Sequence, residues 1–148
     1  MTISPIEAEL LRNAMSSIVD EMFISLMKSS YSTNIKERKD HSTALFDKNG
    51  RVVVQGESMP LHLASMLGLV EIVLEKYGEK NINQGDVFLS NDPYVGRGSH
   101  LPDVAMAAPI FFDFSTSANA APSPTDPLDV LTSSASFFIR LRVFLFIR

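Results

Sequence analysis

Two carboxylates and one imidazole lie close together in residues 91–103, which read Asn-Asp-Pro-Tyr-Val-Gly-Arg-Gly-Ser-His-Leu-Pro-Asp. Two prolines and two glycines interrupt this segment, which predicts a loop rather than a regular helix or a central strand. The three-residue spacing of His100 and Asp103 lets both side chains reach one point. Because mixed nitrogen and oxygen ligands suit zinc, manganese or iron(II), one hypothesis is a divalent-metal site at this pair.

The same loop has a simpler interpretation, in which Asp92 caps a backbone amide and His100 is only partly buried. A histidine with aspartates nearby is a common coincidence, so the residues alone leave both interpretations open. The glycines around Arg97 suggest a phosphate loop, but the rest of either nucleotide-binding fingerprint is missing.

Residues 34–41 and His62 offer further titratable groups. The charged residues of 34–41 fit an anion-binding or interdomain salt-bridge surface, or simply a solvated loop. His41 beside Asp40 favours a surface pair over a catalytic one. His62, at the start of an expected helix, either faces a site formed with the loop or packs and caps. Without cysteine or a Gly-x-Ser-x-Gly motif, nucleophilic catalysis is poorly supported.

Capping signals and hydrophobic periodicity predict the elements that carry these residues. Ser4-Pro5-Ile6-Glu7 is a capping box with proline at the first helical position, and it predicts a helix from about Pro5 to about Ser29. The apolar stripe of this helix comprises Ile6, Leu10, Ala14, Ile18, Met22 and Leu26.

Four shorter elements and a second helix are expected beyond residue 40. Asn49-Gly50, between strand-like runs at 42–46 and 51–55, predicts a β-hairpin. The second helix begins at Met59 and ends near Gly78, and strands follow at 87–90 and 104–112. We therefore predict an α+β fold of mixed helices and a hairpin or sheet, which forms an incomplete part of a larger domain.

The composition excludes several classes of protein. With 148 residues, 45% apolar and 20% charged, the chain is one globular domain in size. A formal net charge of −4 argues against a nucleic-acid binder. The apolar runs are shorter than the roughly 20 residues of a membrane helix, and the N-terminus lacks a secretory pattern. We expect a cytoplasmic protein that binds neither membrane nor nucleic acid.

The composition changes abruptly after Asp113. Residues 114–148 contain six serines, three threonines and three prolines, but no glycine, lysine, glutamate or histidine. The net charge also changes, from −5 for residues 1–113 to +1 for residues 114–148. We therefore expect 1–113 to belong to one domain and 114–148 to be an unrelated tail, either frameshifted or disordered.

Several motifs in order along residues 5–113 give the chain a family resemblance. They are Leu11-Arg12-Asn13-Ala14, Ser32-Thr33-Asn34-Ile35-Lys36-Glu37-Arg38-Lys39-Asp40, Thr43-Ala44-Leu45-Phe46-Asp47, His62-Leu63-Ala64-Ser65-Met66, Gly85-Asp86-Val87, Asn91-Asp92-Pro93-Tyr94 and Gly98-Ser99-His100-Leu101-Pro102-Asp103. The chain resembles the N-terminal part of the hydantoinase B family. That family is similar to the C-terminal part of 5-oxoprolinase and to the alpha subunit of acetone carboxylase.

The resemblance implies part of a hydrolase that opens cyclic amides. Such B-type chains work with an A-type subunit or domain, which binds ATP and phosphorylates the substrate; the carboxylase relatives instead carboxylate a ketone. In those relatives a divalent metal sits on a His-x-x-Asp motif and a later histidine. His100 and Asp103 match the first two ligands, and Asp92 would orient water or a ligand as a catalytic group.

The resemblance ends near Phe112, and no histidine follows His100. A third ligand of the family type is therefore missing, and we expect the chain to be inactive as it stands. A non-catalytic fragment that still binds the A-type subunit is the alternative function.

Overall fold

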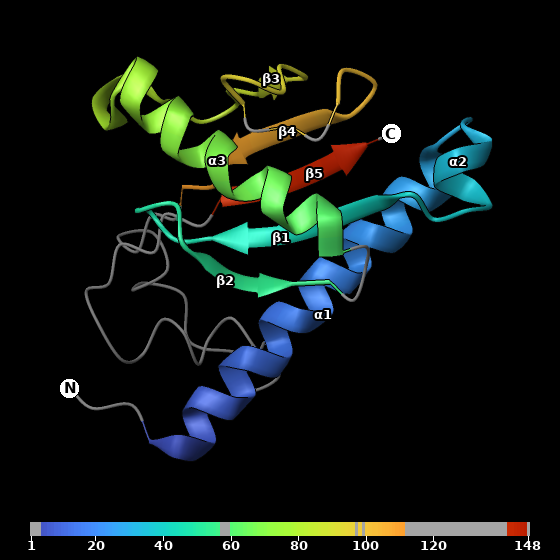
Figure 1. Ribbon diagram of the computed structural model, residues 1–148. Coiled ribbons are helices and arrows are strands. Elements are labelled where there is room, and N and C mark those ends of the chain that lie inside the picture. Colours follow the sequence, from blue (N-terminus) through green and yellow to red (C-terminus); the bar gives the residue numbers. More distant parts are fainter. Residues whose placement is uncertain (1–3, 57–59, 97, 99, 112–141, 148) are drawn as a thin grey trace.

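A five-stranded antiparallel sheet with the strand order β2-β1-β5-β4-β3 forms the centre of the protein (Figure 1). The computed structural model describes residues 4–56, 60–96, 98, 100–111 and 142–147. In chain order the elements are α1 Pro5–Ser29, α2 Thr33–Lys36, β1 His41–Phe46, β2 Val52–Gln55, α3 Pro60–Tyr77, the 3₁₀ turn η1 Glu79–Asn81, β3 Phe88–Ser90, β4 Val104–Pro109 and β5 Arg142–Ile147. Helices packed on an antiparallel sheet confirm the predicted α+β class.

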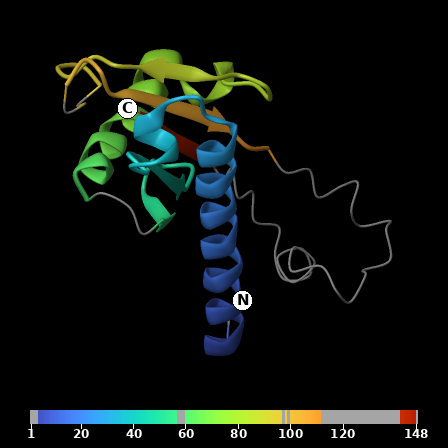
Figure 2. The ribbon, with the colours of Figure 1, turned by 90° about the vertical axis from the view of Figure 1, so that its right-hand side faces the viewer.

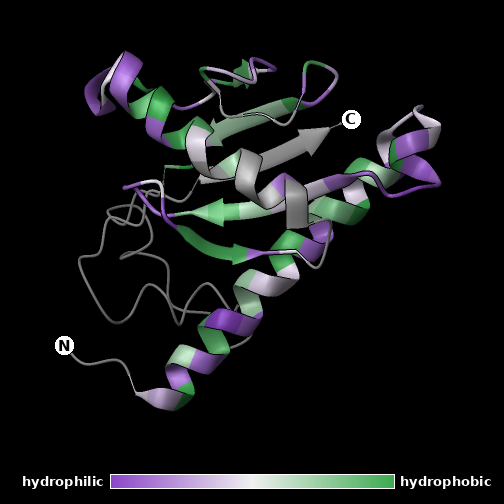
Figure 3. Cartoon of the chain, viewed as in Figure 1, coloured by the Kyte–Doolittle hydropathy of each residue, from purple (hydrophilic) through white to green (hydrophobic). Residues whose placement is uncertain are grey.

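Helix α1 begins with the predicted capping box. The Ser4 hydroxyl accepts a hydrogen bond from the Glu7 amide at 3.3 Å, and the Glu7 carboxylate accepts one from the Ser4 amide at 2.8 Å. The predicted apolar stripe is not a continuous core face, because Ile6 and Leu10 are exposed and only Val19 of this helix is buried. Figure 2 shows the reason: the N-terminal half of α1 extends past the sheet, and Figure 3 shows apolar segments on that half.

Strand β1 lies between α1 and α3, and its side chains alternate between the two helices. The Thr43 hydroxyl donates to the Val19 carbonyl of α1 at 3.0 Å. The Ser42 hydroxyl lies 3.0 Å from Nδ1 of His62 in α3. The even-numbered side chains of β1 therefore face α3, while the odd-numbered ones face α1. All six residues of β1 are buried, as expected for a strand covered on both faces.

The predicted hairpin connects β1 and β2. The Asp47 carboxylate accepts hydrogen bonds from the amides of Asn49 and Arg51, both at 2.9 Å, and these bonds close the turn. Gly50 has a φ of +83°, a left-handed conformation that glycine adopts without strain. The register shifts by a bulge between Leu45 and Phe46.

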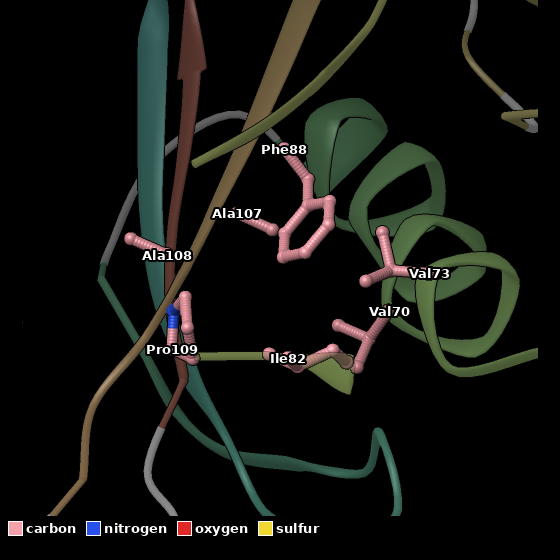
Figure 4. A pocket seen from close by; sticks show the side chains of 7 residues that line it. All are labelled: Val70, Val73, Ile82, Phe88, Ala107, Ala108 and Pro109. Atoms are coloured by element: carbon pink, nitrogen blue, oxygen red, sulfur yellow. The ribbon is translucent and has the colours of Figure 1, made fainter. Parts of the chain in front are cut away.

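The hydrophobic core fills the space between α3 and the sheet. Its buried residues are Ala44, Phe46, Met66, Leu69, Val70, Val73, Ile82, Ala105 and Ala107. A packing gap of about 10 Å³ lies beside Val70 and Phe88, at the lower limit for one water molecule. Figure 4 shows the side chains that line it. The core therefore offers no ligand-sized cavity here. In the described part of the chain, no helix has the length and apolar character to cross a membrane.

The observed elements differ from the predicted ones at a few places. The strands expected at 87–90 and 104–112 are observed as β3 and the shorter β4, with Phe112 outside the described residues. Met59, the expected start of the second helix, also lies outside them. The polar segment before β1 contains the single helical turn α2, which the aperiodic sequence did not predict.

Strand β5, at the centre of the sheet, belongs to residues 114–148, whose composition differs from that of the rest of the chain. Its backbone pairs antiparallel with β1 on one side and β4 on the other. Residues 114–141 and 148 lie outside the described residues. The proposal that 114–148 are an unrelated tail therefore stays a prediction, although six of its residues join the sheet.

Candidate functional site

Two buried aspartates lie at the same end of the sheet, on either side of β5. His41 of β1 and Val104 of β4 both pair with Ile147. Asp40 and Asp103, one residue earlier in each strand, therefore share the end at which β1 and β4 begin (right in Figure 1). Since neighbouring strands are about 4.8 Å apart, the two backbones are separated by about 10 Å.

The strand alternation also predicts the same face for both aspartates. Ala105 and Ala107 of β4 belong to the core beneath α3, and Asp103 continues this odd-numbered set. Asp40 continues the even-numbered set of β1, whose member Ser42 contacts α3. Figure 1 shows the start of α3 and the 91–103 loop at this same end. Three parts of the chain that are distant in sequence, the start of β1, the start of α3 and the loop that leads into β4, thus lie at this end of the sheet.

The predicted pair of His100 and Asp103 is formed by a tight turn. The Asp103 amide donates to the His100 carbonyl at 3.0 Å, which turns the chain back immediately before β4. Nε2 of His100 lies 3.4 Å from Oδ1 of Asp103. The Asp103 side chain is 2% exposed and that of His100 is 40% exposed. The sequence spacing therefore does bring an imidazole and a carboxylate to one point, with access from solvent on the histidine side.

The separation within this pair suits two ligands of one cation. Ligand atoms about 2.1 Å from a tetrahedral ion lie about 3.4 Å apart, close to the observed distance. Within the described residues, Nδ1 of His100 is buried without a hydrogen-bond partner. In the same part of the chain, no third histidine, cysteine or carboxylate completes a group that could hold a metal ion. The imidazole nitrogen of His100 and the carboxylate oxygen of Asp103 therefore supply two of the four ligands of a tetrahedral metal site.

Asp92 is committed to the turn of its own loop. Its Oδ1 accepts hydrogen bonds from the amides of Tyr94 at 2.8 Å and Val95 at 3.1 Å. This is the backbone-capping arrangement that was one of the two interpretations of the loop. Asp92 also lines a surface groove of about 380 Å³ between α3 and β3. Arg97 and Ser99, which bear on the phosphate-loop suggestion, lie outside the described residues.

A second imidazole–carboxylate pair was not predicted from the sequence. Nε2 of His62 lies 3.4 Å from Oδ1 of Asp40, and Nδ1 of His62 lies 3.0 Å from the Ser42 hydroxyl. These three side chains are buried, with residue exposures of 2% for His62, 6% for Asp40 and 0% for Ser42. A signal existed in the sequence, because the polar run Asp-His-Ser-Thr at residues 40–43 leads into β1 before its apolar residues.

His41 corrects one expectation. Rather than forming a surface pair with Asp40, it is fully buried and stacks on Phe23 of α1 with ring centroids 3.9 Å apart. Its Nε2 lies 3.0 Å from the Phe23 carbonyl oxygen. Burial lowers the pKa of His41, against the opposing effects of the Phe23 carbonyl and the Asp40 charge. The neutral ring therefore anchors β1 to α1.

The charged segment before β1 is exposed but ends in a strained residue. Lys36, Arg38 and Lys39 are all exposed, as in the solvated-loop interpretation. Lys39 has a φ of +55°, a left-handed conformation that is uncommon for a residue with a side chain. Such backbone strain often accompanies functional positions, and here it directly precedes the buried Asp40.

Comparison with known proteins assigns the family. The family model described as hydantoinase B/oxoprolinase matches residues 4–121. The chain belongs to this family. Among its relatives, 5-oxoprolinase 1 of Arabidopsis thaliana is 45% identical over 94 residues, which are 64% of this chain and 7% of the relative. Caprolactamase subunit beta of Pseudomonas jessenii is 35% identical over 111 residues, which are 75% of this chain and 19% of that subunit.

A solved structure supports the same family. The chain is similar to ATP-dependent caprolactamase from Pseudomonas jessenii, with a TM-score of 0.71 and 28% identity over 99% of this chain and 21% of the other. The N-terminal hydantoinase B assignment made from the motifs is therefore confirmed. The chain spans less than a quarter of the length of each of these relatives.

Proposed function

We propose that the chain is part of the hydrolytic half of an ATP-dependent enzyme that opens cyclic amides. The observation that carries this proposal is the His100–Asp103 pair, at the end of the sheet where Asp40 also lies. Family membership and the names of the relatives, oxoprolinase and caprolactamase, support the substrate class. A fragment of an acetone carboxylase-type alpha subunit is the alternative within the same family.

In this proposal His100 and Asp103 hold a divalent cation, manganese, zinc or iron(II). The imidazole nitrogen and the carboxylate oxygen provide the mixed ligand set that these ions accept. Such an ion supplies Lewis-acid chemistry and lowers the pKa of bound water. The buried Asp103 holds the ligand set in place through its turn, whereas the partly exposed His100 faces the side from which a substrate would approach.

Asp92 and Asp40 have different roles in the proposed site. Oδ1 of Asp92 accepts hydrogen bonds from two backbone amides. If Asp92 orients water or substrate, it therefore does so through Oδ2. Asp40 lies across β5 from Asp103 and is a carboxylate suited to accept a proton from water. The site thus combines a ligand pair on the β4 side with a base on the β1 side.

The ATP chemistry belongs to a partner in this proposal. The relative from Pseudomonas jessenii is named as a beta subunit, which supports assembly with a second subunit. We propose an A-type subunit or domain that binds ATP in the cytoplasm and phosphorylates the substrate before ring opening. The chain alone, with two ligands in its described part, is then inactive as it stands.

A non-catalytic interaction fragment is the second candidate. Ile6 is 74% exposed and Leu10 is 56% exposed on the part of α1 that extends past the sheet (Figure 2). Exposed apolar residues on a projecting helix favour contact with another protein surface. This function needs only binding to the A-type subunit, without a metal.

Calorimetric titration with Mn²⁺ or Zn²⁺ tests the proposal. We expect one cation per chain, with binding lost in both His100→Ala and Asp103→Ala. Asp20→Ala, which removes an exposed carboxylate from α1, serves as the matched control and should bind like the unaltered chain. Absence of cation binding, with retained association to an A-type subunit, would instead support the interaction fragment.

A further inference from the structure

The groove between α3 and β3 is large enough to bind a small molecule. Its volume of about 380 Å³ lies within the range of about 300–1,000 Å³ that is usual for ligand pockets, whereas the gap in the core measures about 10 Å³. Leu69 and Val73 of α3 and Phe88 of β3 provide an apolar wall. His100 and Asp103 are not among the described residues that line the groove, so it is separate from the proposed cation pair.

The described lining of the groove includes one cationic side chain, Lys76, and one anionic side chain, Asp92. The rings of Tyr77 and Phe88 lie 5.0 Å apart, so the end of α3 that carries Lys76 is beside the start of β3. From Phe88 the chain continues along β3 to Asp92, which at about 3.3 Å per residue is roughly 13 Å away. Leu69, on the opposite wall, lies about 10 Å back along α3 from Lys76. The two charges are therefore near opposite ends of the groove.

Both charged groups are accessible and partly restrained. Lys76 is exposed, and its Nζ lies 5.5 Å from the centroid of the Tyr77 ring, a cation–π contact that keeps the ammonium at this end. Asp92 is also exposed, and its Oδ1 accepts hydrogen bonds from the amides of Tyr94 and Val95. Because an ionised carboxylate accepts about four hydrogen bonds, Asp92 can hold its turn and bind a cationic group at the same time.

We propose that this groove binds a linear amino acid whose carboxylate and ammonium are at opposite ends of an aliphatic chain. Lys76 pairs with the carboxylate, Asp92 pairs with the ammonium, and the aliphatic chain packs on the apolar wall. A chain of five carbons between the two groups, with a charge-assisted hydrogen bond of about 2.8 Å at each end, spans roughly 10–13 Å. This length matches the separation of the two charged residues in the groove.

The proposal rests on the proposed function, because ring opening of a cyclic amide releases a molecule of this kind. Water adds across the C–N bond of the amide: the carbonyl carbon becomes the carboxylate, and the nitrogen leaves as an amine that is protonated at neutral pH. The ring itself carries neither charge. The groove therefore distinguishes the opened product from the closed substrate by charge, which is the chemistry of a product-binding site.

An NMR titration of the side-chain methyl groups with 6-aminohexanoate tests the proposal. We expect saturable shifts of the Leu69, Val73 and Val87 signals, which line the groove, and none of Val19, which is buried in α1. Hexanoate lacks the ammonium and hexylamine lacks the carboxylate, so each should bind about fivefold more weakly, as expected for loss of one exposed ion pair. The neutral ring of caprolactam should bind more weakly than all three.

Two variants separate the charged contacts, and Lys48→Met, in the exposed hairpin turn, is the matched control. Lys76→Met should weaken 6-aminohexanoate and hexanoate but leave hexylamine unchanged. Asp92→Asn retains an oxygen to accept the turn amides, and it should weaken 6-aminohexanoate and hexylamine but leave hexanoate unchanged. Each expected loss is again about fivefold, and Lys48→Met should bind all three probes like the unaltered chain.

Three results would overturn the proposal. Groove signals that do not respond to 6-aminohexanoate would do so without reliance on any variant. Equal shifts with caprolactam would show a groove that responds to apolar molecules regardless of charge. Shifts of the same signals with protein concentration alone would place a second copy of the chain there. Failure of the proposed function looks different: no cation binds in the calorimetric titration, while 6-aminohexanoate still shifts the groove signals.

Discussion

Acidification should destabilise the protein through His41, the ring that joins β1 to α1. The ordinary pKa of this group is 6.5, and burial lowers it in the folded protein. At pH values between the lowered pKa of the folded protein and 6.5, the unfolded chain binds a proton on His41 that the folded chain does not. The free energy of unfolding therefore falls as the pH decreases below about 6.5, and the His41 contribution is fully present only above that value.

The size of the effect follows from the complete burial of the ring. At about pH 5.5, one unit below the ordinary pKa, nine tenths of unfolded chains carry a proton on His41. If the folded ring stays neutral, this difference costs about 1.4 kcal/mol, the upper limit at that pH. The Phe23 carbonyl and the Asp40 charge both favour the protonated ring and reduce the cost.

Urea unfolding at several pH values measures this contribution against a variant that cannot titrate. His41→Phe keeps an aromatic ring in place to stack on Phe23. We expect the unaltered chain to lose up to about 1.4 kcal/mol more than the variant between pH 7.5 and 5.5. Parallel curves for the two proteins would show that the carbonyl and the Asp40 charge cancel the effect of burial on the His41 pKa. A relative gain for the unaltered chain in acid would show that they outweigh it.

Substitutions at three positions test the packing of the fold by the same unfolding measurement. Thr43→Val removes the hydroxyl that donates to the Val19 carbonyl and should cost about 1 kcal/mol, whereas Thr43→Ser should retain most of that contact. Met66→Ala, in the core beneath α3, should cost about 2–5 kcal/mol, against less than about 1.5 kcal/mol for Met66→Leu. Gly50→Ala places a side chain at a φ of +83° and should cost about 1 kcal/mol, so an unchanged midpoint would contradict the turn assignment.

Local signals were sufficient for most elements. The capping box determines where α1 starts, and Asn49-Gly50 determines where the hairpin turns, because both depend on hydrogen bonds within a few residues. The same is true of the His100–Asp103 pair, which one turn brings together. The apolar stripe along α1 is exposed in its first half, at Ile6 and Leu10, since periodicity shows which face is apolar but not whether anything covers it.

Long-range contacts account for what the sequence did not predict. His41 was expected at the surface because it follows a charged segment, yet the pairing of β1 with β2 and β5 places it beneath α1. Likewise, the contact between Asp40 and His62 joins residues 22 positions apart through the packing of α3 on the sheet. Neither contact follows from spacing or propensity, because each depends on which elements become neighbours.

The polar side chains of the site occur at element boundaries for an energetic reason. Asp40 and Asp103 each precede a strand by one residue, and His62 is in the first turn of α3. A carboxylate placed deeper in the sheet would lose its hydration without access to substrate, at a cost of several kcal/mol. At the end of the sheet the same group is buried enough to be held in one orientation, yet remains next to loops. The strain at Lys39 is consistent with this compromise, because the chain must turn sharply to enter β1 with Asp40 directed toward α3.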